Sequence, residues 1–542
     1  MSGLTPDDLT PSQQPAYAAR EPRVLILGGP GTGKTAVALL TARRILEEEP
    51  LGSSKRVLFL TFSRSATAEL ARRAPLVLAG DKGQRIEIST FHAFAVGMLN
   101  GFRRFAGGPL EAAKILTPWQ EKLHIAPVGS VTFDALVPAA LDLLRSAPWL
   151  AAEYRSRYVA VICDEYQDTS SSSANLLEEL ARSAQLICLA DADQVIFDWT
   201  DDTITRRIQD FQASGAREYD LGYDSRRDPS NVIPRAAAAI RRRAFGDDSI
   251  AEACRGGRLR VLQHRAVDEP FGVLVAEIRS VLAEGAGEIG VFLATNRSVN
   301  EFAERLRDED IEHEIMGLSG AAGEAQIAAA ACARVAVGDD EWETFLVALG
   351  VFVASCYRGE PPILAVGLAR DRDSLDPGIL ASLDRERDAI VQMNGAPFET
   401  FLNRVGSLWS RLFFGRPRQL WELGVRDLRG QTLGIRRRPL DQPLARSLSR
   451  IAEARRGFSL VDDIPGSGAP VRLMNVYQVK GREMDDVLLV HLPEDRDEWD
   501  RVGMLRLSRV HYVSITRARR RATFVLPSDP RPFFAPYSRL CG

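Results

Sequence analysis

The chain has 542 residues, more than one hydrophobic core usually organises, so two or more domains are expected. Its hydrophobic fraction of 45% supports such cores, and its net charge of −3 excludes a strongly basic molecule, so any basic groove must be local. The six cysteines form no Cys-x-x-Cys pair, which predicts neither a zinc site nor a disulfide framework. Residues 1–14 lack an apolar core and the run 345–357 is too short to cross a bilayer. We therefore expect a cytoplasmic protein with no membrane partner.

A glycine-rich loop follows the first apolar strand-like run, residues 24–27, and precedes a helix-forming run. Glycines at this junction let successive backbone N–H groups turn inward, where they and the helix N-terminus bind polyphosphate. Lys34 is then expected at the terminal phosphates and Thr35 at Mg²⁺. The plain alternative is an ordinary strand-to-helix turn. The loop residues are Gly28, Gly29, Pro30, Gly31, Thr32, Gly33, Lys34 and Thr35.

Apolar strand-like runs and helical runs alternate over the first part of the chain, which predicts a parallel α/β sheet with crossover helices. Residues 95–155 lose this alternation and look mostly helical, as an insertion would. Strands are expected at 56–62, 85–90, 159–163 and 186–189, and helices at 35–49 and 65–73.

Acidic residues come directly after the predicted strand 159–163, at the sheet edge where open α/β folds bind ligands. Beside a phosphate loop, Asp164 is expected to hold Mg²⁺ and Glu165 to orient and deprotonate the attacking water. Gln194, after the neighbouring strand, is placed to sense the γ-phosphate. The alternative is an acid pair that only caps the next helix.

Ordered motifs along the chain resemble those of the UvrD/Rep/PcrA-type superfamily-one DNA helicases. The acidic run Asp164-Glu165-Tyr166-Gln167-Asp168-Thr169 is the most diagnostic of them. The others are Leu9-Thr10 with Gln13, the glycine-rich loop, Thr61-Phe62, Thr90-Phe91-His92, Asp193-Gln194 with Trp199, the segment around Arg226, Val479-Lys480-Gly481-Arg482-Glu483, and Tyr512 through Ala518 with Arg517.

The resemblance implies an α/β fold with two RecA-like P-loop domains, each with a parallel sheet and a short, mainly helical insertion. The first domain would be 1–222 with an insertion at about 95–155, the second 223–317 plus 470–542, and 318–469 a reduced helical accessory insertion. The resemblance also implies nucleotide contacts from Gln13 and Glu483, arginine fingers at Arg226 and Arg517, and DNA contacts from Phe62, His92, Trp199 and Tyr477.

The leading functional prediction is an ATP- and Mg²⁺-dependent helicase or translocase on single-stranded DNA, moving 3′ to 5′ as the resemblance implies, in DNA repair or antiviral defence. Several positions depart from the family pattern, among them Asn475, Tyr477 and Arg482, and these changes affect DNA contacts more than phosphate chemistry. They favour an alternative: a nucleotide-sensing, DNA-responsive ATPase subunit that regulates a partner nuclease, similar to the compact helicase-like subunit of the Gabija anti-phage system. The arginine runs 436–438 and 519–521 are either phosphate contacts or solvated basic faces.

Overall fold

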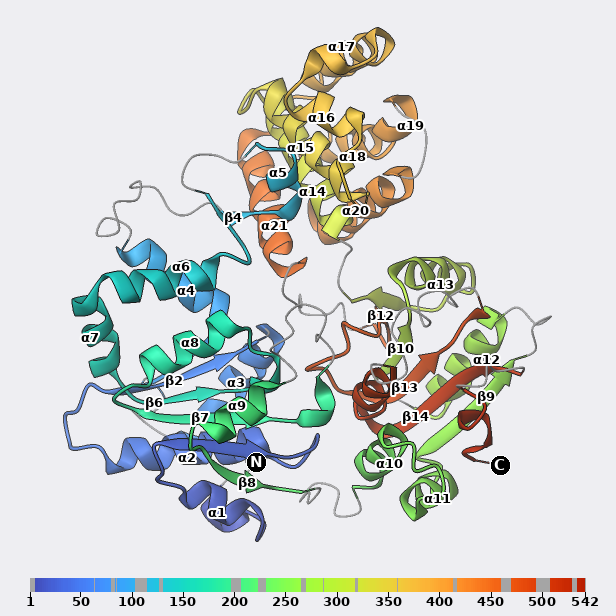
Figure 1. Cartoon of the computed structure of the whole chain (residues 1–542). Helices are drawn as coiled ribbons and strands as arrows, with labels where there is room; N and C mark the ends of the chain where they lie inside the picture. The colour runs from blue at the N-terminus through green and yellow to red at the C-terminus, as the bar shows by residue number, and fades with distance from the viewer. Residues whose placement is uncertain are drawn as a thin grey trace. The chain divides into compact units, whose positions relative to one another are not determined.

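A computed structural model provides the structure of the chain (Figure 1). It describes residues 5–62, 64–78, 83, 85–102, 115–125, 130–195, 206–222, 231–264, 270–285, 287–316, 320–357, 359–412, 417–459, 469–493, 507–528 and 534–541. The chain divides into two compact units. Unit 1 comprises Met1–Phe102, Leu136–Met316 and Pro465–Gly542, and unit 2 comprises Arg103–Ala135 and Gly317–Ile464.

The first sheet of unit 1 contains six strands, all paired in parallel. Alternate residues point to opposite faces of a strand, and here both faces are apolar, as a sheet covered by helices on both sides requires. Val24 and Ile26 of one strand and Val57 and Phe59 of another belong to a single buried cluster. In spatial order the strands are β3 (Ile86–Thr90), β2 (Arg56–Thr61), β6 (Tyr158–Cys163), β7 (Gln185–Ala190), β1 (Arg23–Leu27) and β8 (Arg217–Asp220).

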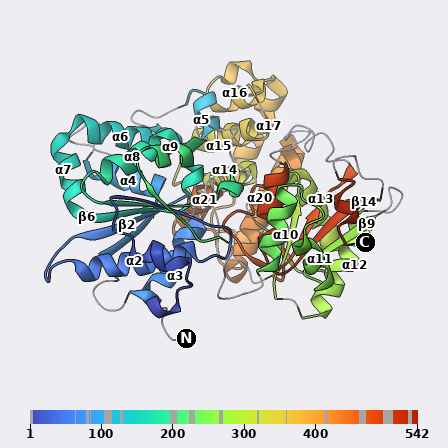
Figure 2. The same ribbon diagram turned by 60° about the horizontal axis from the view of Figure 1, so that its bottom comes forward.

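Helices cover both faces of this sheet. Figure 2 shows α2 and α3 on one face and α4, α6, α7 and α8 on the other. The helices of this part are α1 (Gln13–Ala18), α2 (Lys34–Glu48), α3 (Arg64–Val77), α4 (Phe91–Phe102), α6 (Leu136–Ser146), α7 (Pro148–Arg157), α8 (Ser171–Leu180) and α9 (Arg207–Ala213).

The second sheet of unit 1 also has six parallel strands. Ile289, Val291 and Leu293 belong to a cluster with α12 and α13, whereas Phe292 belongs to the cluster with α10 and α11 on the opposite face. The strands are, in order, β11 (His313–Ile315), β12 (Val471–Asn475), β10 (Ile289–Leu293), β13 (Met484–Val490), β14 (Ala518–Pro527) and β9 (Leu259–His264). The helices are α10 (Val232–Arg241), α11 (Asp248–Arg255), α12 (Pro270–Ala283) and α13 (Asn296–Asp308), with a further helical segment at 507–515. The predicted α/β fold with two parallel sheets is confirmed.

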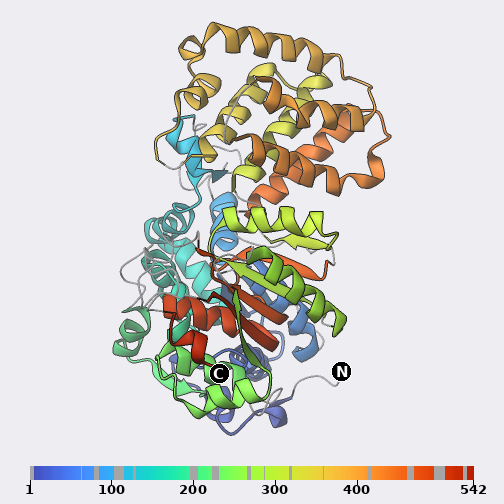
Figure 3. The same ribbon diagram turned by 90° about the vertical axis from the view of Figure 1, so that its right-hand side faces the viewer.

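Unit 2 is a helical body built around the alanine-rich α14 (Gly320–Ala336), which packs against α15, α20 and α21. Small side chains allow this close packing: a Cβ on Gly424 of α20 would lie 2.6 Å from the Ala322 carbonyl oxygen of α14. Figure 3 shows these helices in yellow and orange, packed together. The other helices are α15 (Trp342–Ser355), α16 (Ile363–Ala369), α17 (Pro377–Val391), α18 (Phe398–Gly406), α19 (Leu408–Leu412), α20 (Pro417–Gln431) and α21 (Gln442–Ser459).

A segment from early in the chain completes unit 2. It contains α5 (Pro118–Lys122) and a two-stranded parallel sheet of β4 (Ile115–Leu116) and β5 (Val131–Thr132). Lys122 Nζ donates to the Gly359 carbonyl at 3.0 Å, and a Cβ on Gly320 would collide with the Trp119 ring, 2.4 Å away. Part of the region predicted to be one insertion therefore packs on the later helices, while α6 and α7 pack in unit 1.

The cysteine spacing predicts no disulfide framework, and the structure contains one disulfide between distant cysteines. Cys254 of α11 and Cys541 near the C-terminus form a disulfide, with a Cα–Cα separation of 5.4 Å. Because 287 residues separate the two cysteines, no local spacing pattern could indicate the pair. Among the described helices, none is long and apolar enough to cross a membrane.

Buried histidines make the stability of unit 1 dependent on pH. Burial lowers the pKa of His491 to about 3, and the ring packs 4.4 Å from Phe534. As the pH falls through about 6.5, the unfolded chain protonates this residue and the folded chain does not, so the free energy of unfolding decreases. Relative to His491→Gln, the wild type should lose about 2 kcal/mol between pH 7 and pH 5. Urea unfolding of both proteins at pH 7 and pH 5 measures this difference. An equal change in the free energy of unfolding in wild type and variant would contradict the prediction.

Candidate nucleotide site

The glycine-rich loop joins the end of β1 to α2, whose N-cap is Gly33. Gly31 and Gly33 have φ values of +78° and +83°, a left-handed backbone that side-chain-bearing residues rarely adopt. A Cβ on Gly28 would lie 2.7 Å from Thr32 Oγ1, and one on Gly33 would lie 2.7 Å from Gln13 Nε2. Glycine is therefore required here for both backbone conformation and space, which leaves the backbone N–H groups open to a phosphate.

Side chains of the loop fold onto its own backbone. Lys34 Nζ donates to the carbonyl oxygens of Gly28 and Gly29 at 2.6 and 3.2 Å. The buried Thr32 hydroxyl donates to Gly29 O at 2.8 Å, while Pro30 and Thr35 are partly exposed. The lysine ammonium group thus lies on the inner side of the loop.

Gln13 connects the N-terminal turn to this loop. Its amide oxygen accepts from Thr10 N at 2.9 Å, and its Nε2 donates to the Thr32 carbonyl at 2.7 Å. The side chain is buried, 19 residues away from Thr32 in sequence. The polar side chain therefore reaches the loop instead of only capping α1.

Asp164 and Glu165 lie at the carboxyl end of β6, where the backbone turns sharply. Glu165 has a φ of 53°, an uncommon conformation for a residue with a side chain, and its N–H donates to Asp164 Oδ1 at 3.0 Å. Burial and the adjacent Glu165 raise the pKa of Asp164 to about 6. Burial also pushes the pKa of Glu165 upward, but Lys480 and Lys34 more than offset this and hold it below its usual value. Glu165 is thus ionised at neutral pH.

A hydrogen-bonded chain links the ends of β6 and β7. Gln167 donates to Glu165 Oε2, and its own amide oxygen accepts from Asp191 N at 3.1 Å. Asp191 Oδ2 accepts from Gln194 Nε2 at 2.8 Å. Glu165 and Gln194 are therefore held in one network at adjacent strand ends.

Residues that follow the strands of the second sheet join the same network. Arg517 Nη2 donates to Gln194 Oε1 at 3.3 Å, and Tyr512 Oη donates to Asp191 Oδ2 at 3.2 Å. Lys480 donates to Asp168 Oδ2 and to the Gln194 carbonyl, the latter at 3.0 Å, and its Nζ lies 3.6 Å from Glu165 Oε2. Within unit 1, Asp191, which follows a strand of the first sheet, binds the amide nitrogen of Gln194. Arg517, which adjoins a strand of the second sheet, binds its amide oxygen.

Sequence reasoning gave no role to Asp168, Asp191 or Tyr512, although all three are buried in this network. The signal for Asp191 was present, because it directly follows β7 just as Asp164 follows β6. Tyr512 begins the motif that ends at Ala518, but its contact with Asp191 depends on the fold and has no local signal.

The metal ligands predicted from the sequence are one carboxylate, Asp164, and one hydroxyl, Thr35. Within the described residues no group of three or more His, Cys, Asp or Glu side chains is arranged to hold a metal ion. This donor set suits Mg²⁺, which keeps several waters and is commonly held by one or two carboxylates together with substrate phosphates.

The residues predicted to contact DNA do not all lie in the described part of the chain. Phe62 is partly buried and packs edge-on against Phe91, 6.5 Å between centroids, and His92 is partly buried at the start of α4. Tyr477 is partly buried and packs against the hydrophobic cluster that the second sheet forms with α10 and α11. Trp199 and Arg226, the latter predicted to be an arginine finger, lie outside the described residues.

Two further predicted features lie at the surface of the second sheet. The carboxylate of Glu483, predicted to contact nucleotide, lies 3.5 Å from Arg519 Nε. Arg520 and Arg521 both pair with Asp486 and Glu284. The arginine run 519–521 is thus engaged by acidic side chains.

Two parallel sheets and a phosphate-type loop at the end of β1 define a P-loop protein with two RecA-like sheets. Comparison with known proteins narrows this class. Residues 9–108 and 109–213 match the model of the UvrD/REP helicase N-terminal domain.

Curated relatives agree with this match. The chain is 25% identical over 393 residues to the ATP-dependent DNA helicase UvrD1 of Mycobacterium tuberculosis, covering 57% of this chain and 50% of that protein. It is 26% identical over 248 residues to the ATP-dependent DNA helicase PcrA of Leuconostoc citreum, covering 34% and 33%. These matches support a UvrD/Rep/PcrA-type helicase family for this chain, which spans at most about half the length of these relatives.

A solved structure, S. cerevisiae Dbp5 bound to RNA and ADP BeF3, aligns with 98% of this chain and 86% of its own, at 13% identity and a TM-score of 0.38.

Proposed function

We propose that the chain is an ATP-driven motor that acts on single-stranded DNA. Two similar proteins, UvrD1 and PcrA, are named ATP-dependent DNA helicases, which supports this choice of nucleotide and substrate. In this proposal the loop holds the phosphates of ATP, Lys34 contacts the terminal phosphates, and Gln13 and Glu483 contact the nucleoside.

Mg²⁺ is proposed to bind between Thr35, Asp164 and the nucleotide phosphates, where it supplies charge neutralisation. Glu165 is proposed to orient and deprotonate the attacking water. Its lowered pKa supports this role, because a general base must be ionised at the working pH.

The observation that carries the proposal is the environment of Gln194. Its Nε2 binds Asp191 and its Oε1 binds Arg517, so one side chain joins the two halves of unit 1. A γ-phosphate sensor in this position would couple nucleotide state to movement of one sheet against the other, as a motor requires.

A test of the proposal compares ATP hydrolysis with and without single-stranded DNA, alongside strand displacement from a 3′ overhang. We expect DNA to stimulate hydrolysis and the strand annealed beside the 3′ overhang to be displaced, in agreement with 3′-to-5′ movement. Lys34→Ala should reduce hydrolysis by about a hundredfold or more, because it removes a charge that contacts the phosphates. Lys55→Ala, in an exposed turn before β2, is the matched control. Unchanged hydrolysis in Lys34→Ala would overturn the site assignment.

A second candidate function is a nucleotide-sensing, DNA-responsive ATPase that regulates a partner nuclease in antiviral defence. The structure around Asn475 favours it: Asn475 Oδ1 accepts from Tyr477 N and Gln478 N at 3.0 and 3.1 Å, and Nδ2 donates to Asn296. The polar atoms of the Asn475 side chain are thus bound within the protein, and Asn475 and Tyr477 are positions at which this sequence departs from the family pattern. Hydrolysis that responds to DNA without strand displacement would support this candidate, and co-purification would identify the nuclease.

A further inference from the structure

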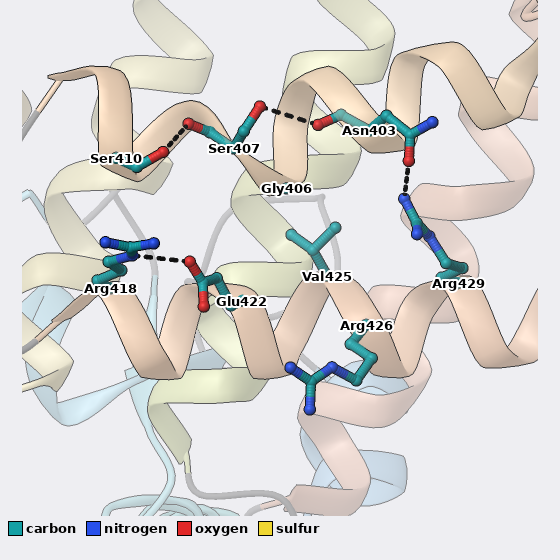
Figure 4. A pocket seen from close by; sticks show the side chains of 9 residues that line it. All are labelled: Asn403, Gly406, Ser407, Ser410, Arg418, Glu422, Val425, Arg426 and Arg429. Carbon is teal, nitrogen blue, oxygen red and sulfur yellow. Dashed lines mark hydrogen bonds and ion pairs between the residues drawn. The ribbon is translucent and has the colours of Figure 1, made fainter.

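A pocket on unit 2 lies between α18, α19 and α20 and has a volume of about 330 Å³ (Figure 4). This volume is at the low end for ligand pockets and suits a small group. Val425 forms an apolar patch of its lining, and three arginines of α20, Arg418, Arg426 and Arg429, line it together with one carboxylate, Glu422. The pocket therefore carries a local excess of positive charge.

The only carboxylate in the lining is already engaged. Arg418 Nε donates to Glu422 Oε1 at 2.9 Å, one helical turn away (Figure 4). The nearby Asp427 accepts from Gln326 Nε2 at 2.6 Å and is thus directed to α14. No carboxylate of the lining is left for Arg426 or Arg429.

Other acidic groups near the pocket are bound by different arginines. The buried Glu386 of α17 accepts from both Arg404 and Arg411, at 2.9 Å in each case. Burial opposes ionisation of this carboxyl, yet the two arginines hold its pKa below the usual value. The Glu386 carboxylate is therefore already paired with two arginines and does not neutralise the pocket.

Two guanidinium groups remain with spare donors. In the described part of the chain no hydrogen bond or ion pair engages the Arg426 side chain, and in Figure 4 no dashed line joins it to another residue of the lining. Arg429 donates through Nη2 to Asn403, but its Nε is buried and has no partner among the described residues. Arginines three residues apart share one face of a helix, where like charges repel. An anion bound at this end of α20 would reduce that repulsion and supply acceptors for the open donors.

We infer that this pocket binds a phosphate group, held by Arg426 and Arg429 of α20. Phosphate matches the planar donor fork of arginine, and its size fits the pocket. The phosphate can come from a nucleic-acid backbone or from a free phosphorylated small molecule. The inference is independent of the proposed motor function, since every residue it uses lies in unit 2.

Hydrogen–deuterium exchange of the full chain tests the inference locally. Inorganic pyrophosphate and an oligothymidylate are added separately, and exchange is followed in peptides covering α18 and α20. Protection by both probes identifies a nucleic-acid backbone site, and protection by pyrophosphate alone identifies a small-molecule site. If neither probe protects these peptides, the inference is overturned. Peptides covering residues 28–35 report the motor site separately, so failure of one proposal does not imply failure of the other.

Variants make the test specific. In Arg426→Gln/Arg429→Gln the protection of α18 and α20 should require at least about tenfold more of the same probe, because charge-assisted hydrogen bonds are lost. The control Arg385→Gln removes an exposed arginine of α17 in the same unit and should behave as wild type. An unchanged melting temperature confirms that the double variant is folded. Protection equal to wild type in a folded double variant would overturn the assignment.

Discussion

Glu165→Gln is expected to abolish most ATP hydrolysis while ATP binding is retained. Loss of a positioned general base reduces turnover by about a hundredfold to ten-thousandfold. Glutamine is nearly isosteric but cannot accept the proton of the attacking water. Lys480, which lies 3.6 Å from Glu165 Oε2, keeps its ion pair with Asp168 in this variant, so the junction of the two sheets should persist.

Steady-state hydrolysis and equilibrium binding of a fluorescent ATP analogue measure the two properties separately. Glu153→Gln is the matched control, because Glu153 is an exposed residue of α7 in the same unit. If Glu165→Gln weakened binding as strongly as it slowed hydrolysis, the residue would be a structural member of the acidic cluster and not the base.

The sequence predicted the regular elements that have a strong local signal. The helix expected at 35–49 is α2, Lys34–Glu48, shifted by one residue, and the buried strand at 159–163 is β6, one residue longer. The edge strand β8 was missed because its four residues, Arg217–Asp220, are mostly polar and exposed. Its strand conformation depends on parallel pairing with β1, which no local pattern specifies.

Long-range packing limited the prediction of the rest. Residues 103–135 belong with residues 317–464 in one unit, and this grouping depends on contacts such as that of Trp119 with Gly320, 201 positions apart. The disulfide between Cys254 and Cys541 was missed for the same reason.

The candidate site follows a similar division. Residues adjacent in sequence to a strand end, such as Lys34, Asp164 and Gln194, could be assigned because motif and strand occur together. Their partners across the two sheets could not: the sequence indicates that Lys480 and Asp168 belong to motifs, but not that they form an ion pair. The assignment of roles to individual residues remains a prediction that the variants test.

Arg517→Ala should slow ATP hydrolysis by about a thousandfold with little change in nucleotide affinity. An arginine finger acts on the charge that develops in the transition state, so its loss reduces turnover more than ground-state binding. Arg517 is placed for this role: it is buried, its Nε donates to Val513 O at 3.0 Å, and its Nη2 reaches the γ-phosphate sensor proposed at Gln194. Single-turnover hydrolysis and analogue binding measure the two effects.

A purely structural role for Arg517 predicts a different pattern. Removing a buried hydrogen-bonded guanidinium would then lower the melting temperature and weaken nucleotide binding together. Arg517→Lys separates the two cases, because lysine keeps the charge and loses the planar fork that can bind Gln194 and a phosphate at once. An intermediate rate with wild-type melting temperature and affinity is expected for a finger. The control Arg297→Ala, an exposed arginine of α13 that pairs with Glu301, should leave both measurements unchanged.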